Sequence, residues 1–124
     1  MKVCFPVALI AVAVALSAPA HAQNAERGKQ LFEQCSACHS LTAGQNGTGP
    51  HLHGLLGRKS ASVEDYTYSP PLRRANVVWT GELLDNFLAN PQSGAFRGNK
   101  MPYAGMADTQ ARADLIAYLK GATQ

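Results

Sequence analysis

The chain has 124 residues, of which 11 are Lys or Arg and 8 are Asp or Glu, so its formal net charge is +3. This mildly basic balance does not suggest a protein that binds nucleic acid, which usually carries a strongly basic surface. A chain of this length suits one domain with a small core.

The first 22 residues have the pattern of a secretory signal peptide. Lys2 supplies a short positive region, and residues 3–16 are mostly apolar. Ala20 and Ala22 are small residues at the positions that a signal peptidase reads. The apolar run is shorter than the roughly 20 residues that span a bilayer. An uncleaved membrane anchor is the alternative. We expect cleavage after Ala22, no stable membrane insertion afterwards, and one mature domain over residues 23–124.

Two helices are predicted in the first half of this domain, with little of the alternation that is typical of strands. The first covers residues 25–34, with Asn24 as its N-cap. A glycine-rich loop follows. The second helix is short, at residues 72–75, with Ser69 as its N-cap and two prolines in its first turn.

Two longer helices are predicted toward the C-terminus. Thr80 caps the first, which ends at Asn90-Pro91, and Asp108 caps the second. Gly121 is predicted to stop the last helix. An all-α domain with such long loops has a thin core, which a buried, flat apolar cofactor would complete.

The sequence Cys-Ser-Ala-Cys-His at residues 35–39 carries the chemistry. Because residues i, i+3 and i+4 share a face of a helical turn, Cys35 and Cys38 can each add to a vinyl group of one porphyrin. His39 is then placed to bind the iron. Haem attachment is the favoured interpretation, and export agrees with it, because c-type attachment is made outside the cytoplasm.

Other interpretations of the two cysteines are weaker. A disulfide between them would close a very small loop and stabilise the fold little. A thioredoxin-like thiol pair would need a βαβ pattern, which the sequence lacks. A zinc site completed by His51 or His53 lacks the usual spacing between its ligands.

Haem iron has a second axial position, for which Met and His are the common ligands. Met101 lies in a predicted loop rather than on a helix face, so we interpret it as a ligand rather than a core residue. Met106 is the reserve candidate. His51 and His53 are too near the first ligand in sequence to reach around the ring easily, and we interpret both as loop or surface residues.

The sequence resembles the class I c-type cytochromes, which include mitochondrial cytochrome c and its bacterial photosynthetic relatives. The resemblance covers about residues 25–123. The features that carry it are the Cys-Ser-Ala-Cys-His motif, the run from Thr48 to Arg58, Tyr68, Trp79, Asn90-Pro91, Lys100-Met101 and the run from Arg112 to Lys120.

The resemblance implies an all-α class I cytochrome c fold, with four or five helices and long loops around one haem c. It implies that Cys35 and Cys38 form the thioether bonds and that His39 and Met101 bind the iron. The Pro50 carbonyl would accept the ring N–H of His39 and fix its orientation.

The resemblance further implies that Arg58, Tyr68 and Trp79 face a haem propionate, Arg58 as its charge partner and the others through hydrogen bonds. It also implies that the first and last helices cross, with Gly28 and Phe32 against Leu115 and Tyr118.

Three positions depart from the mitochondrial pattern. Phe87 replaces a tyrosine and Leu72 replaces an asparagine, which makes the expected haem pocket more apolar. Asn99 replaces a threonine and can still form hydrogen bonds. Few lysines remain of the mitochondrial docking face.

These features predict a soluble, periplasmic, monomeric one-electron carrier that is not an enzyme. Lys29, Arg97 and Lys100, near an exposed haem edge, would meet an acidic patch on a periplasmic redox protein in a transient encounter. That partner would be a membrane oxidoreductase, an oxidase or a dehydrogenase. One alternative is a dedicated electron-transfer subunit of a periplasmic dehydrogenase or terminal oxidase complex. A peroxidase-like or ligand-binding haem protein is the other.

Overall fold

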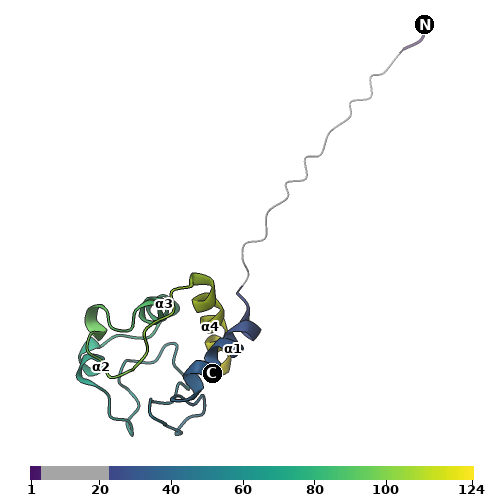
Figure 1. Cartoon of the computed structure of the whole chain (residues 1–124). Helices are drawn as coiled ribbons and strands as arrows, with labels where there is room; N and C mark the ends of the chain where they lie inside the picture. The colour runs from purple at the N-terminus through teal and green to yellow at the C-terminus, as the bar shows by residue number, and fades with distance from the viewer. Residues whose placement is uncertain (4–22) are drawn as a thin grey trace.

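The structure, a computed structural model, describes residues 1–3 and 23–124. Over residues 23–124, helices joined by long loops form the fold, and there is no strand beyond one isolated bridge between Lys59 and Val78. The elements in chain order are α1 (Ala25–Ser36), α2 (Pro70–Ala75), α3 (Gly81–Ala89), the 3-10 turn η1 (Gly94–Phe96) and α4 (Thr109–Ala122) (Figure 1). The predicted all-α fold is confirmed.

The expected signal peptide lies outside the described residues, apart from its first three positions. None of the described helices has both the length and the apolar character that a bilayer-spanning segment needs.

Helices α1 and α4, from opposite ends of the domain, cross in contact with each other (Figure 1). The crossing is close because Gly28 has no side chain: a Cβ there would overlap the backbone carbonyl of Asp114 and lie 2.8 Å from the Cβ of Tyr118. One turn further along α1, the ring of Phe32 lies 5.7 Å from the ring of Tyr118. The predicted crossing of the first and last helices is therefore confirmed.

Three of the predicted N-caps form as expected. The side chain of Asn24 accepts the N–H of Arg27 at 3.0 Å, and Thr80 Oγ1 accepts the N–H of Leu83 at 3.1 Å. Asp108 accepts the N–H of Ala111 at 2.9 Å in the same way. Each cap satisfies a helix-end donor that has no partner within its helix.

One predicted cap lacks its side-chain bond, and one predicted helix end is wrong. Ser69 is the N-cap residue of α2 as predicted, but its hydroxyl accepts the backbone N–H of Lys100 at 3.3 Å instead of capping the helix. Helix α4 continues through Gly121 to Ala122. Thr123 closes it, because both its N–H and its hydroxyl donate to the carbonyl of Leu119, at 3.1 and 2.7 Å. The Ser69 hydroxyl is thus used by a residue distant in sequence, whereas the end of α4 is set by the local bonds of Thr123.

The core lies between α3 and α4 and continues into an aromatic cluster of Trp79, Phe87 and Phe96. The ring of Trp79 is stacked on Phe96 at 5.4 Å and meets Phe87 edge-on at 5.2 Å. Leu115 in α4 is 1% exposed. The apolar face of α3 thereby forms one wall of the cavity described next.

Candidate haem site

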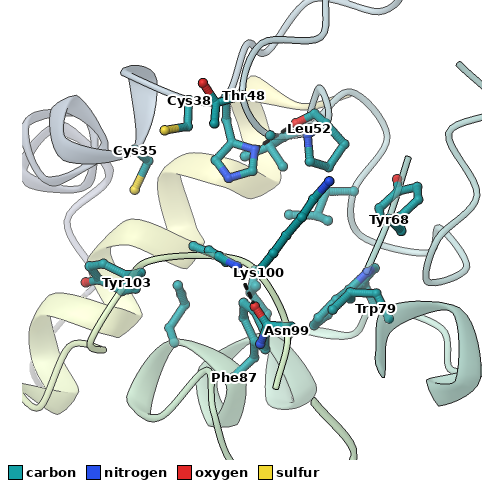
Figure 2. Close-up of a pocket in the computed structure, with 18 of the residues that line it drawn as sticks. Cys35, Cys38, Thr48, Leu52, Tyr68, Trp79, Phe87, Asn99, Lys100 and Tyr103 are labelled. Atoms are coloured by element: carbon teal, nitrogen blue, oxygen red, sulfur yellow. Dashed lines mark hydrogen bonds between the residues drawn. The ribbon is translucent and has the colours of Figure 1, made fainter. Parts of the chain in front are cut away.

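One cavity of about 370 Å³ occupies the middle of the domain. Its walls are mostly apolar, and its volume is within the range of small-molecule and cofactor sites. All eight side chains that the sequence predicted for a haem site line it: Cys35, Cys38, His39, Pro50, Arg58, Tyr68, Trp79 and Met101. Figure 2 shows the two cysteines on one side of the cavity and Trp79 and Tyr68 on another.

The two cysteines are presented by the end of α1. Helix α1 ends at Ser36, but the turn continues, because the N–H groups of Cys38 and His39 both donate to the carbonyl of Cys35, at 3.1 and 3.0 Å. Both thiols are free and half-buried. Burial, followed by the proximity of Cys38, raises the pKa of the Cys35 thiol. The turn therefore holds both thiols at the cavity wall.

His39 is oriented by the loop that follows it. Its Nδ1 lies 2.7 Å from the carbonyl oxygen of Pro50, which can only accept, so Nδ1 carries the hydrogen and Nε2 keeps its lone pair. Gly49 allows this packing, because a Cβ there would stand 2.7 Å from Nδ1 of the ring. Burial lowers the pKa of His39, the Pro50 hydrogen bond opposes this, and Arg58 adds to it. The ring is thus held neutral, in the form that binds a metal.

Arg58 is a half-buried cation whose hydrogen bonds are incomplete. One terminal nitrogen donates to the carbonyls of His51 and His53, at 3.0 and 2.8 Å. Its Nε is buried with no hydrogen-bond partner among the described residues. A buried unpaired donor on a charged group is costly. Burial lowers the pKa of Arg58, and Tyr68 partly offsets this. An anion in the cavity beside Arg58 would complete its bonding.

Tyr68 lies on the same side of the cavity. Its hydroxyl accepts the N–H of Val63 at 3.3 Å, which leaves its own hydrogen able to donate. Trp79 is buried in the aromatic cluster, with an indole N–H that needs an acceptor when buried. Together with Arg58, these donors suit the carboxylates of haem propionates.

Met101 lines the cavity from the loop between η1 and α4, far along the chain from His39. The reserve candidate Met106 is buried in the core and does not line the cavity, so the preference for Met101 agrees with the geometry. His51 and His53 also lie outside the cavity wall. His53 is exposed as predicted, whereas His51 is partly buried.

The two apolar substitutions that the sequence singled out are both in the cavity wall. Leu72, from α2, and Phe87, from α3, line it directly. Asn99 also lines the cavity, but its side chain forms hydrogen bonds with the backbone of its own loop. The pocket is accordingly as apolar at these positions as predicted.

Two residues at the cavity edge have contacts that the sequence did not predict: Lys100, expected only as a docking residue, and Tyr103. Lys100 donates to the Thr67 carbonyl, and its Nζ lies 4.7 Å from the centre of the Tyr66 ring, so its side chain spans from the Met101 loop toward the Tyr68 segment (Figure 2). Tyr103 lines the cavity near Cys35 (Figure 2). Because Tyr103 follows Met101 by two residues, its position in the sequence could have indicated that it lies at the cavity.

These residues fit a porphyrin: two thiols, a neutral imidazole and a thioether meet in one apolar cavity that has cationic and hydroxyl donors at one end. The fold and site define a helical protein that holds a covalently attached haem. A comparison with protein families matches residues 25–123 to the family described as Cytochrome c. The chain belongs to the cytochrome c family.

The chain is similar along most of its length to individual cytochromes. It is 40% identical over 120 residues to cytochrome c2 of Blastochloris viridis, covering 96% of this chain and 91% of that protein. It is 46% identical over 98 residues to cytochrome c of Euglena viridis, covering 78% and 95%. It is 43% identical over 98 residues to cytochrome c-550 of Ancylobacter novellus, covering 76% and 91%.

Family membership establishes the cofactor and the general activity. The chain carries haem c, attached covalently through cysteines, and Cys35 and Cys38 are the pair in the attachment motif. It is a monohaem electron carrier of the cytochrome c family.

Proposed function

We propose that the protein is a soluble periplasmic one-electron carrier whose iron is bound by His39 and Met101. In this proposal Cys35 and Cys38 form the thioether bonds. When bound, the haem supplies an Fe(III)/Fe(II) couple that accepts and returns one electron. No substrate is transformed, so the protein acts between other redox proteins and is not itself an enzyme.

The observation that carries this proposal is that His39 and Met101, from distant parts of the chain, line one apolar cavity. If both residues bound the iron, the haem would offer no open coordination position to a substrate. The Pro50 carbonyl holds His39 through a 2.7 Å hydrogen bond, so the imidazole keeps its orientation in both oxidation states. Leu72 and Phe87 exclude water from the wall, which lowers the reorganisation that accompanies a change of charge.

The residues at the propionate end have a separate role in this proposal. Arg58 would neutralise a propionate through its unpaired Nε, and Tyr68 and Trp79 would donate hydrogen bonds to it. A propionate buried without such partners would carry a large desolvation cost.

The ligand assignment is tested by the absorption spectrum of the ferric holoprotein. A far-red band from sulfur-to-iron charge transfer is expected in the wild type and absent in Met101→Ala. Met106→Ala is the matched control, because Met106 is buried in the core outside the cavity wall. Loss of the band in Met106→Ala, or its survival in Met101→Ala, would overturn the assignment and favour a ligand-binding haem protein.

We propose export to the periplasm with cleavage after Ala22. The support is the charged, apolar and small-residue pattern of residues 1–22, together with a family match that begins at residue 25. Intact mass of the protein from a bacterial periplasmic fraction is expected to correspond to residues 23–124 plus one haem. A mass that includes the first 22 residues would contradict cleavage and favour an anchored form.

Docking to an acidic partner surface is the third part of the proposal. Lys29 and Arg97 are exposed, whereas the ammonium group of Lys100 is engaged with Thr67 and Tyr66. We therefore assign docking to Arg97 and Lys29 more than to Lys100. Transient partners of this kind bury little surface, and charge steers their encounter.

The rate constant for electron transfer to ferricyanide, an anionic oxidant, is expected to fall as ionic strength rises. Arg97→Gln is expected to lower it about two- to threefold at low salt, and Lys120→Gln, outside the proposed docking surface, serves as the control. Rates that do not depend on salt would remove the electrostatic part of the proposal.

A further inference from the structure

The loop that carries Met101 contains a buried asparagine that bonds only to its own loop. Asn99 is 7% exposed although it lines the haem cavity. Its amide nitrogen donates to the carbonyls of Pro91 and Phe96, at 2.6 and 2.9 Å. Its amide oxygen accepts the backbone N–H of Met101 at 2.9 Å, and Figure 2 shows that oxygen facing the chain beside Lys100. Every polar atom of the side chain is used to fold the loop.

Gln92 bonds to the same loop from its outer side. Its amide oxygen accepts the N–H of Gly98 at 2.9 Å, and its amide nitrogen donates to the carbonyl of Asn99 at 3.0 Å. The same nitrogen lies 3.4 Å from the carbonyl of Met101. The carbonyl of Met101 also accepts the backbone N–H of Tyr103 at 2.9 Å. Asn99 therefore holds the N–H of Met101, and Gln92 adds a longer side-chain contact to a carbonyl that the backbone already binds.

We propose that Asn99 and Gln92 are positioning residues that hold the backbone of Met101 in place, so that its sulfur resists displacement from the iron by an external ligand. This inference rests on the proposed role of Met101 as an iron ligand. An external ligand reaches the iron only when the Met101 segment moves away. Its apparent affinity is therefore its intrinsic affinity multiplied by the fraction of molecules with the loop open. Hydrogen bonds that are lost on opening keep that fraction small.

The test measures binding of imidazole to the ferric holoprotein, with the far-red sulfur-to-iron band as a second readout. Gln92→Ala removes contacts of an exposed side chain, so it is expected to fold, and it is expected to tighten imidazole binding about 3- to 10-fold. Asn99→Ala removes three bonds from a buried site and is expected to tighten binding by about 10-fold or more.

Asn46→Ala is the matched control for a merely structural effect. Asn46 also ties loops together, accepting the N–H of His51 at 2.9 Å and donating to the carboxylate of Asp65 at 3.0 Å, but it does not line the cavity. It is expected to lower global stability without changing imidazole affinity. If Asn46→Ala tightens imidazole binding as much as Gln92→Ala does, the positioning role is wrong.

Met101→Ala separates this inference from the proposed function. If Met101→Ala leaves imidazole affinity unchanged, Met101 is not the ligand, and the proposed function fails together with the inference. If Met101→Ala tightens binding but neither Gln92→Ala nor Asn99→Ala does, the ligand assignment stands and only the positioning role is overturned.

Discussion

Arg58 is the residue whose chemistry the cavity most directly constrains. It is a cation at the cavity wall, with one terminal nitrogen bonded to two backbone carbonyls and a buried Nε that has no partner among the described residues. The carbonyl bonds fix the guanidinium, and the free Nε is available to an anion. In the proposed haem site its charge would act on the iron as well as on a propionate, because a nearby cation disfavours the more positive oxidised state.

Replacing Arg58 by Gln is expected to lower the reduction potential by about 30–70 mV. A unit charge roughly 10 Å from a redox centre, at an effective dielectric constant near 20, is worth about 1.7 kcal/mol. This is about 70 mV for one electron, before screening by solvent reduces it. Removing the cation stabilises the ferric state, so the potential falls. Voltammetry of the holoprotein measures the change.

Arg58→Lys is the control for this prediction, because it keeps the charge and loses the planar fork. We expect less than half of the change that Arg58→Gln produces. An unchanged or higher potential in Arg58→Gln would show that Arg58 does not act on the haem through its charge.

The sequence located the cavity residues well because a covalent motif and its spacing define them. Cys35, Cys38 and His39 follow from local geometry, and the family resemblance added the more distant residues. Asn99 was noticed only as a substitution, and Gln92 not at all. Their partners are set by the path of the loop, which the amino-acid pattern of Gln92 to Pro102 does not encode.

At the scale of elements, the crossing of α1 and α4 depends on the absence of a side chain at Gly28. A Cβ there would overlap the Asp114 carbonyl, and since this is helix backbone, it has no flexible end that could move aside. The turn that follows α1 carries Cys38 and His39, so any displacement of α1 also moves the haem-attachment motif.

Gly28→Ala is expected to destabilise the holoprotein by about 3 kcal/mol, because overpacking forces the two helices apart. Guanidinium unfolding followed by circular dichroism measures this. The matched control is Gly121→Ala in α4, where a Cβ would meet nothing within 4 Å. That change is expected to stabilise by up to about 1 kcal/mol, since alanine favours a helix interior. Equal effects of the two changes would show that the close crossing is not what Gly28 provides.

The helix starts were predictable because Asn24, Thr80 and Asp108 bond to N–H groups only three residues away. The two differences, at Ser69 and Gly121, have a common cause. Ser69 is the N-cap residue of α2 as predicted, but its hydroxyl binds the backbone N–H of Lys100 rather than a helix N–H. The residue type at Gly121 permits a helix end, but Thr123 closes α4 two residues later. Local capping rules consider only neighbouring residues, so they do not predict which of several possible partners a side chain will bind.

For the whole molecule, one buried carboxylate joins the two ends of the domain. Asp114 in α4 is 1% exposed. It accepts the backbone N–H of Asn24 at 2.8 Å, the guanidinium of Arg27 at 2.9 Å and the amide of Gln110 at 2.9 Å. The bond from the Asn24 N–H, 90 residues away, fixes the start of α1 against α4. The same carboxylate therefore contributes to the helix crossing that supports the haem-attachment turn.

The charge on Asp114 makes the stability of the domain depend on acid. The Asn24 N–H bond lowers the pKa of Asp114 most; burial opposes this, and Gln110 and Arg27 lower the pKa further. Because the folded pKa is below the unfolded value of about 3.9, the carboxylate stabilises the fold fully above that value. This contribution is lost as the pH falls through the folded pKa. We expect the free energy of unfolding to drop more steeply below about pH 4 in the wild type than in Asp114→Asn, which removes this titration. Denaturant unfolding between pH 2 and 7 measures both curves, and parallel curves would show that Asp114 does not couple protonation to folding.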